Sequence, residues 1–299
     1  MMQQRVVWLK ILLWIFRDSI VAGWSLKAPP STGLGSSKPP DFSFLPSSFL
    51  HVMDHILSPP PPKNEFKALE DISNAKIPTD NGEAEIFAYV SEPVAPKTSE
   101  PLPLLILIHE FFGLNESIQQ KADALANELQ CRVVAPDTFR GINTDFVPQA
   151  IWLALSTPQD RVNRDLDAVV QHYSEKSSKL AVMGFCYGGG KAVRYTIQNQ
   201  PQAATVIFYG NPVTDPDELK RLQAPVFAAY GRNDIQFPMP LLQQFQLALN
   251  SANIENDIKI YDGVGHAFWK NIEQIRRGEE PASSAYRQCT DFLRRFFAA

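Results

Sequence analysis

The sequence has few cysteines and no block of like charge. Its 299 residues include 3 Cys, and 28 Lys plus Arg nearly balance 32 Asp plus Glu, for a net charge of −4. Because Cys131, Cys186 and Cys289 form no C-x-x-C pair, neither a disulfide framework nor a structural zinc site is expected, and a reducing intracellular compartment fits best. The absence of a clustered basic run argues against nucleic acid as a partner.

Near the N-terminus, the uncharged apolar run is too short for a transmembrane span. Ile11 to Phe16 falls far below the roughly 18 residues that a spanning helix needs. Basic and hydroxyl residues outnumber acidic ones around this run, as in an organellar transit peptide or a helix lying on a membrane surface. An extension without fixed structure is weighted equally. The protein is then cytoplasmic, or organellar if the segment is a transit peptide.

A run of four prolines at positions 59–62 marks the predicted domain boundary, because polyproline is stiff and cannot join a packed core. We therefore expect an N-terminal extension over residues 1–64 and one α/β domain over residues 65–299.

Within that domain, apolar runs of strand length alternate with amphipathic segments of helix length. Strands are predicted at Glu83–Val90 (an edge strand), Leu104–His109, Arg132–Asp137, Leu180–Cys186, Thr205–Gly210, Pro225–Gly231 and Asp257–Tyr261. Helices are predicted from the Asn115 cap to Gln130, over Asp160–Lys176, after Cys186, over Leu241–Ser251 and over Ser283–Phe297. Repeated β-α units of this size predict a mostly parallel sheet with helices on both faces.

The most informative stretch is Gly184-Phe185-Cys186-Tyr187-Gly188-Gly189-Gly190, between a predicted strand and a predicted helix. Small residues two before and two after a central residue are what a sharp strand-to-helix turn requires, because neighbouring Cβ atoms would clash there. The pattern matches the nucleophile elbow G-x-S-x-G with Cys in place of Ser. Cys186 is therefore the predicted nucleophile.

Other reactive groups follow the predicted strands, at the edge of a parallel sheet where ligands bind. They are His109-Glu110, Asp234 and His266. A nucleophilic thiol needs a base within hydrogen-bond reach and a group that orients the base. We expect His266 to be the base and Asp234 to orient it. His109 is a possible base too, although packing beneath the neighbouring loop is favoured.

Two backbone amides are candidates for an oxyanion hole, which stabilises the negative charge of a tetrahedral intermediate. One belongs to Tyr187, directly after the nucleophile, and the other to Phe111, in the loop after the first buried strand. Other motifs fail. Gly188 to Lys191 resembles part of a phosphate loop, but Ala192 stands where Ser or Thr would bind magnesium. His109-Glu110 does not extend to H-E-x-x-H, so no metal or cofactor is predicted.

Five motifs in order make the chain similar to the dienelactone hydrolase (carboxymethylenebutenolidase) family of the α/β-hydrolase superfamily, over roughly residues 83–297. They are Glu110-Phe111-Phe112-Gly113, Ala135-Pro136-Asp137, Gly184 to Gly189, Gly231 to Asp234, and Val264-Gly265-His266-Ala267-Phe268. The resemblance implies an α/β-hydrolase fold and hydrolysis of a small ester or lactone through an acyl-enzyme. A general carboxylesterase or thioesterase, and a catalytically silent binding module, are the alternatives.

The resemblance also implies roles for residues around Cys186. Glu110 matches a glutamate that interacts with the resting thiol and promotes its ionisation. Lys270 stands where relatives acting on dienelactone carry an arginine that holds the substrate carboxylate, and Arg140 is a possible substitute. A lysine lacks the planar fork of arginine, so bidentate carboxylate binding does not carry over. Trp269 is predicted to bind substrate as part of the pocket wall, and a place in the core is the alternative.

Overall fold

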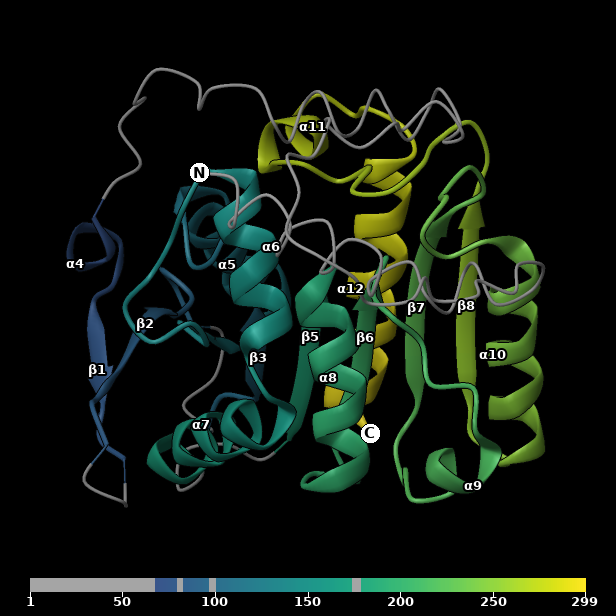
Figure 1. Cartoon of the computed structure of the whole chain (residues 1–299), viewed down its shortest axis with the longest axis horizontal. Coiled ribbons are helices and arrows are strands. Elements are labelled where there is room, and N and C mark those ends of the chain that lie inside the picture. The colour runs from purple at the N-terminus through teal and green to yellow at the C-terminus, as the bar shows by residue number, and fades with distance from the viewer. Residues whose placement is uncertain (1–67, 80–82, 97–100, 174–178) are drawn as a thin grey trace, which may run out of the picture. The chain divides into compact units, whose positions relative to one another are not determined.

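The protein is built on one eight-stranded sheet with the strand order β1-β2-β4-β3-β5-β6-β7-β8 (Figure 1). The structure, a computed structural model, describes residues 68–79, 83–96, 101–173 and 179–299. The predicted extension and its boundary lie outside these residues. The strands are β1 Ala75–Ile77, β2 Ile86–Ser91, β3 Leu104–Ile108, β4 Arg132–Pro136, β5 Leu180–Phe185, β6 Ala204–Phe208, β7 Val226–Gly231 and β8 Asn256–Tyr261.

Helices connect the strands and cover the sheet. They are α4 Leu69–Ile72, α5 Glu116–Leu129, α6 Val147–Ser156, α7 Gln159–Tyr173, α8 Tyr187–Gln198, α9 Pro216–Leu219, α10 Met239–Ser251, α11 Ile272–Arg276 and α12 Ala282–Ala298. The Asn115 cap is confirmed, since its side chain accepts a hydrogen bond from the Ile118 amide at 3.2 Å. Satisfying an otherwise unpaired amide fixes the start of α5.

Strands β3 to β8 run parallel, as the alternating pattern predicted, and only β1 and β2 pair antiparallel with their neighbours. The carboxyl ends of the parallel strands therefore meet along one edge of the sheet, which we call the carboxyl edge. The prediction of an edge strand over residues 83–90 was wrong in its position, because the short strand β1 pairs outside β2. Three residues are too few for a period-2 pattern to reveal β1.

Both faces of the central strands are buried, which explains their uninterrupted apolar sequences. Alternate residues of β3 divide between two clusters. Leu105 and Leu107 pack with residues of α5 and α12, whereas Leu104, Ile106 and Ile108 pack with residues of α7 and α8. The sheet is thus held between two helical layers, and the strand ends that carry the reactive groups sit on a rigid support.

Helix α6 was not predicted. Its sequence is apolar on almost every side and so lacks the 3.6-residue period on which helix prediction depends. Among the described residues, no helix combines the length and the apolar character that spanning a membrane requires.

Candidate active site

Cys186 occupies a sharp turn between β5 and α8. Its backbone has a φ of 51°, a left-handed conformation that a non-glycine residue adopts only under constraint. The glycine spacing makes the turn possible: a Cβ on Gly184 would lie 2.1 Å from the Gly188 carbonyl oxygen, and one on Gly188 would lie 2.3 Å from the Ile108 oxygen. Because no side chain fits there, the backbone closes tightly and presents the half-buried thiol at the carboxyl edge.

The structure brings Cys186, His266 and Asp234 together from three different strand ends. The His266 Nε2 atom lies 3.1 Å from Cys186 Sγ, and His266 Nδ1 lies 2.8 Å from Asp234 Oδ2. The three residues stand 80 and 32 positions apart in sequence. They meet because each follows a parallel strand of the same sheet, β5, β7 or β8, and the carboxyl ends of these strands lie along one edge.

Asp234 is fixed before it meets the histidine. The residue is 3% exposed, and its Oδ1 accepts hydrogen bonds from the amides of Gln236 at 2.8 Å and Phe237 at 3.2 Å. These bonds leave Oδ2 to face the imidazole. An Nδ1–H donated to a carboxylate holds one tautomer and one ring orientation, which leaves Nε2 directed at the thiol.

The pKa of His266 reflects this pairing. Burial lowers it, but the hydrogen bonds to Asp234 and Cys186 outweigh burial and raise the pKa to about 10. The imidazole therefore holds its proton at neutral pH, with Nε2 3.1 Å from Cys186 Sγ. The other two cysteines differ: burial raises the pKa of Cys131 and of Cys289 far above the ordinary value, so both stay protonated.

The loop after β3 lies beside the thiol and carries Phe111. Gly113 donates to the Glu110 carbonyl at 3.1 Å and has a φ of +86°, with Asn143 packed where a Cβ would point. Thr144 donates to the Phe112 carbonyl at 3.0 Å. Within the described part of the chain, no acceptor is bonded to the amide of Phe111 or of Tyr187. Two unpaired donors of this kind are what the predicted oxyanion hole requires.

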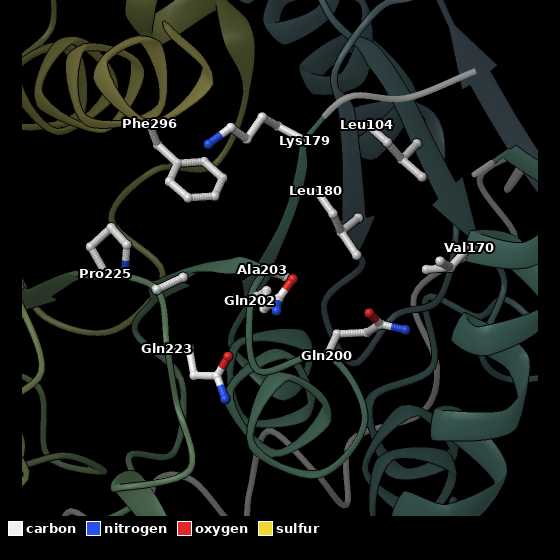
Figure 2. Close-up of a pocket in the computed structure, with 11 residues that line it drawn as sticks. Leu104, Val170, Lys179, Leu180, Gln200, Gln202, Ala203, Gln223, Pro225 and Phe296 are labelled. Atoms are coloured by element: carbon white, nitrogen blue, oxygen red, sulfur yellow. The ribbon is translucent and has the colours of Figure 1, made fainter. Parts of the chain in front are cut away.

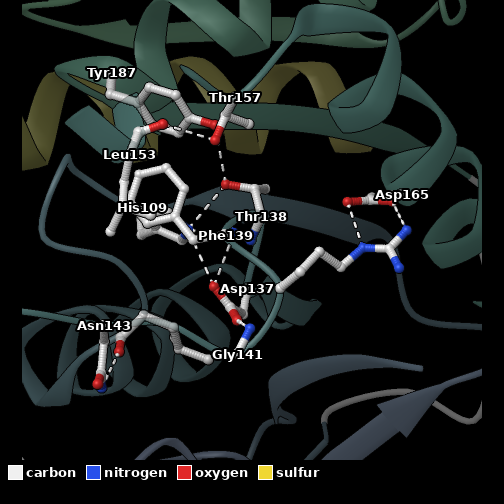
Figure 3. Close-up of polar contacts among 12 residues, drawn as sticks. His109, Asp137, Thr138, Phe139, Gly141, Asn143, Leu153, Thr157, Asp165 and Tyr187 are labelled. Carbon is white, nitrogen blue, oxygen red and sulfur yellow. Dashed lines mark hydrogen bonds and ion pairs between the residues drawn. The ribbon is translucent and has the colours of Figure 1, made fainter. Parts of the chain in front are cut away.

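His109 packs against this loop, as the sequence favoured for it, and Figure 3 shows its ring beside Phe139 and Thr138. It is fully buried, and its Nδ1 lies 2.7 Å from the Glu110 carbonyl oxygen. Its Nε2 lies 2.9 Å from the Thr138 hydroxyl, which in turn lies 3.2 Å from the Tyr187 hydroxyl. Burial lowers the pKa of His109 to about 4. A neutral ring donating through Nδ1 fixes the Glu110–Phe111 peptide plane, and with it the direction of the Phe111 amide.

Glu110 is 18% exposed at its side chain and faces the fold interior. Its Oε1 accepts a hydrogen bond from Tyr209 at 3.1 Å and lies 4.0 Å from the ammonium of Lys121 on α5. Tyr209 also packs edge-on against His266, with ring centroids 5.3 Å apart. Sequence reasoning missed Lys121 and Tyr209, because a lysine inside an amphipathic helix and a tyrosine ending a strand are ordinary local features.

Two residues predicted to bind substrate, Arg140 and Lys270, lie in different environments. Arg140 donates hydrogen bonds to Asp165 of α7, to Glu83 and to the Ala84 carbonyl, so its guanidinium is engaged by the protein. Lys270 is exposed, and its contacts with other described residues run through its backbone.

Trp269 is 0% exposed and packs edge-on against Phe185 and Phe208, with centroids 5.1 Å apart in each case. Of the two alternatives left by the sequence, the structure places its ring in the core, where it has no surface to offer a substrate.

Other features of the described residues add no second reactive centre. No group of three or more His, Cys, Asp or Glu side chains in the described ranges is arranged to hold a metal ion. A cavity of about 500 Å³ opens at the amino ends of the parallel strands, on the opposite edge of the sheet from Cys186 (Figure 2). Glutamine side chains and Lys179 surround it, together with apolar strand starts such as Leu104 and Leu180.

Several bacterial proteins are among the curated relatives of the chain. A protein of Escherichia coli (strain K12) assigned as a carboxymethylenebutenolidase is 32% identical over 190 residues, which are 58% of this chain and 70% of the relative. A protein of Methylorubrum extorquens with the same assignment is 28% identical over 242 residues, or 75% and 81% of the two chains.

Solved structures agree with this relationship. The crystal structure of a Klebsiella pneumoniae protein assigned as a dienelactone hydrolase matches with a TM-score of 0.63 and 26% identity, covering 73% of this chain and 97% of the other. A dienelactone hydrolase-like promiscuous phosphotriesterase from metagenomic libraries shares the fold, with a TM-score of 0.62 at 16% identity over 75% and 98% of the chains. The model of the dienelactone hydrolase family matches residues 86–297. The chain therefore belongs to the dienelactone hydrolase family of carboxylic ester hydrolases, and it has the α/β-hydrolase fold of that family.

Proposed function

We propose that the protein hydrolyses a small ester or lactone with Cys186 as nucleophile, His266 as acid and base, and Asp234 as the group that orients His266. One observation carries the proposal: the continuous chain of contacts from Cys186 Sγ through His266 to Asp234, at 3.1 and 2.8 Å. The strained backbone of Cys186 supports it further, because non-glycine residues in that conformation concentrate at functional sites.

In the first half of the proposed reaction, the Cys186 thiolate attacks the carbonyl carbon of the substrate. The carbonyl oxygen becomes an oxyanion, which accepts hydrogen bonds from the amides of Phe111 and Tyr187. The C–O bond to the leaving group then breaks, and His266 gives its proton to the departing alkoxide. The products are a thioester on Cys186 and an alcohol, which stays attached to the acyl chain when the substrate is a lactone.

In the second half, His266 removes a proton from water, and the resulting hydroxide attacks the thioester carbon. The Cys186 thiolate leaves, and a carboxylic acid is released. Asp234 stabilises the imidazolium at both stages, since its carboxylate stays paired with Nδ1. No cofactor, metal or nucleic acid takes part in this scheme, and the only partner that it needs is the small-molecule substrate.

A general carboxylesterase or thioesterase is the second candidate, and the state of Arg140 favours it over an enzyme for anionic lactones. The Arg140 guanidinium is occupied by Asp165 and Glu83, and a lysine at position 270 offers a point charge without a bidentate fork. Hydrolysis rates of neutral p-nitrophenyl esters and of carboxylate-bearing lactones separate the two candidates. A preference for the lactones that falls in Lys270→Met or Arg140→Met assigns an anion site to those residues.

The nucleophile is tested with a p-nitrophenyl ester and intact-protein mass spectrometry. We expect the wild type to gain the mass of one acyl group on Cys186 early in turnover, and Cys186→Ala to lose turnover by roughly 1,000-fold or more. Cys289→Ala is the matched control, because Cys289 is buried in the core and is expected to leave turnover within about threefold. Turnover retained by Cys186→Ala would contradict the proposal.

A further inference from the structure

Lys121 is a charged side chain with no exposure, which requires an explanation. Its ammonium is 0% exposed, and burying a lysine is costly unless its charge is compensated. It lies 3.3 Å from the Trp269 carbonyl oxygen and 4.0 Å from Glu110 Oε1. It also sits over the rings of Phe185 and Trp269, 4.4 and 5.4 Å from their centroids. Phe185 immediately precedes Cys186, so this charge lies directly behind the elbow.

The hydroxyl of Tyr209 lies within hydrogen-bond distance of two acceptors, one of which is Glu110. The Tyr209 hydroxyl lies 3.0 Å from the Trp269 carbonyl oxygen and 3.1 Å from Glu110 Oε1. A hydroxyl has one proton, and both neighbours are acceptors. Lys121 donates to the same Trp269 carbonyl, so that oxygen keeps a donor when the Tyr209 proton goes to Glu110. The lysine thus supports the Glu110 carboxylate twice: its charge faces the carboxylate, and its hydrogen bond satisfies the carbonyl that competes for the tyrosine proton.

The Cys186 thiol and the Glu110 carboxylate have different hydrogen-bond partners. The Cys186 Sγ atom lies 3.1 Å from His266 Nε2, and Glu110 accepts a hydrogen bond from the Tyr209 hydroxyl. Glu110, Cys186, Tyr209 and Lys121 come from four elements, and His266 packs on the Tyr209 ring. We propose that Lys121 is a positioning residue that keeps Glu110 ionised and docked on Tyr209, so that the Cys186 proton passes to His266 and not to Glu110.

This inference rests on the proposed function in one respect, that Cys186 is the nucleophile. It assigns Glu110 a role different from the one implied by the family resemblance, in which the glutamate itself interacts with the resting thiol. Desolvation lowers the pKa of Lys121, and Glu110 opposes that effect, which agrees with mutual dependence of the two groups. Breaking a buried pair by removing one partner leaves the other charge uncompensated, whereas removing both is often tolerated.

The direct test is infrared difference spectroscopy at neutral pH. The wild type minus Glu110→Gln should show a carboxylate band for Glu110. The same difference in a Lys121→Met background, Lys121→Met minus the double variant Lys121→Met/Glu110→Gln, should show a carboxylic acid band instead. A carboxylic acid in the wild type, or a carboxylate that persists without Lys121, would overturn the inference.

Two further variants guard against effects of folding. Lys121→Gln can still donate to the Trp269 carbonyl but lacks the charge, and it should also yield the carboxylic acid band. Lys179→Met is the matched control, because Lys179 also lies over a ring, 5.2 Å from Phe296, but at the opposite edge of the sheet. It should leave the carboxylate band unchanged. The wild-type spectrum decides the ionisation of Glu110 even if no Lys121 variant folds.

The reactivity of Cys186 gives an independent readout. The rate at which iodoacetamide alkylates Cys186 is measured between pH 5 and 9. In Lys121→Met, the plot of rate against pH should contain one titration step that the wild type lacks. In the double variant Lys121→Met/Glu110→Gln, that step should be absent. A profile identical to wild type would refute the inference. Neither the infrared nor the alkylation measurement needs turnover, so a negative result refutes the role of Lys121 alone. The proposed hydrolysis is refuted by a different result, which is turnover retained by Cys186→Ala.

Discussion

The two edges of the sheet differ in what their residues do, although the same strands form both. At the carboxyl edge, backbone strain at Cys186 and three hydrogen-bonded side chains meet in a compact arrangement. At the opposite edge, which we call the amino edge because the parallel strands begin there, lies a cavity of about 500 Å³. It is lined by glutamines, Lys179 and the apolar first residues of strands (Figure 2). The comparison teaches that the reactive centre we propose is marked by convergent polar groups of matched chemistry, and not by the size of a hollow.

The largest expected effect comes from one atom at the carboxyl edge. In Cys186→Ser, the hydroxyl keeps the size of the nucleophile but is far harder to ionise, so kcat/KM should fall roughly 1,000-fold or more. Ester hydrolysis at pH 7, with thermal unfolding as the folding control, measures this. A serine variant within tenfold of the wild type would contradict the role assigned to the thiolate.

The next largest loss of kcat/KM is expected at Asp234, the acidic residue of the proposed triad. In Asp234→Asn, the side-chain amide can no longer accept the Nδ1–H of His266 as a carboxylate does, so the tautomer and the imidazolium lose support. We expect a loss of about 100-fold in kcat/KM at pH 7. Asp217→Asn is the matched control, because Asp217 is an exposed residue of the short helix α9, and its side chain does not cap that helix, which is capped by Asp215. Equal effects of the two variants would break the assignment of Asp234.

A smaller effect, visible in stability, is expected at His109. Its folded pKa is about 4 and its ordinary value is 6.5. As pH falls from 6.5 to 4, the unfolded chain binds a proton that the folded protein does not, so the free energy of unfolding falls by about 1.4 kcal/mol per pH unit from this group. His109→Asn, which keeps a donor for the Glu110 carbonyl, should lose that slope.

The check on His109 is urea unfolding of both proteins at pH 4.5, 5.5 and 6.5. Burial raises the pKa of the neighbouring Asp137 to about 6, and that shift acts in the opposite direction. Asp137 is present in both proteins and lies 3.8 Å from His109 Nε2, so the difference between the curves reports His109 together with its coupling to Asp137. Parallel curves for wild type and variant would show that His109 is not a buried neutral base in the fold.

The smallest expected effect is at the amino edge. Gln202→Ala enlarges the cavity in Figure 2 without touching the carboxyl edge, so kcat/KM should stay within about twofold of the wild type. Steady-state hydrolysis of the same ester measures it. A tenfold loss would mean that the two edges are coupled and that the contrast drawn between them is too sharp.

Much of the fold could be predicted because the central strands and helices carry strong local patterns. Uninterrupted apolar runs predicted the parallel strands, and Asn115 predicted the start of α5. Strand β1 was too short to show a period, and the uniformly apolar α6 showed none. The residues at strand ends could be named from the sequence, since parallel strands align their carboxyl ends at one edge.

Side-chain partners over long distances could not be predicted. The contacts of Glu110 with Lys121 and Tyr209 depend on how α5 and β6 pack against the loop after β3. The environments of Arg140 and Trp269 likewise depend on α7 and on an aromatic cluster built from several elements. No local spacing in the sequence encodes these distances.

The central claim is that Cys186 alone among the three cysteines is activated, and that His266 activates it. Alkylation by iodoacetamide at pH 6.5, followed by peptide mass spectrometry, tests it directly, since an ordinary thiol with a pKa of about 8.5 is almost fully protonated there. The account predicts that Cys186 reacts at least about tenfold faster than Cys131 and Cys289, and that this advantage is lost in His266→Ala. Equal rates for all three thiols, or an advantage that survives in His266→Ala, would contradict it.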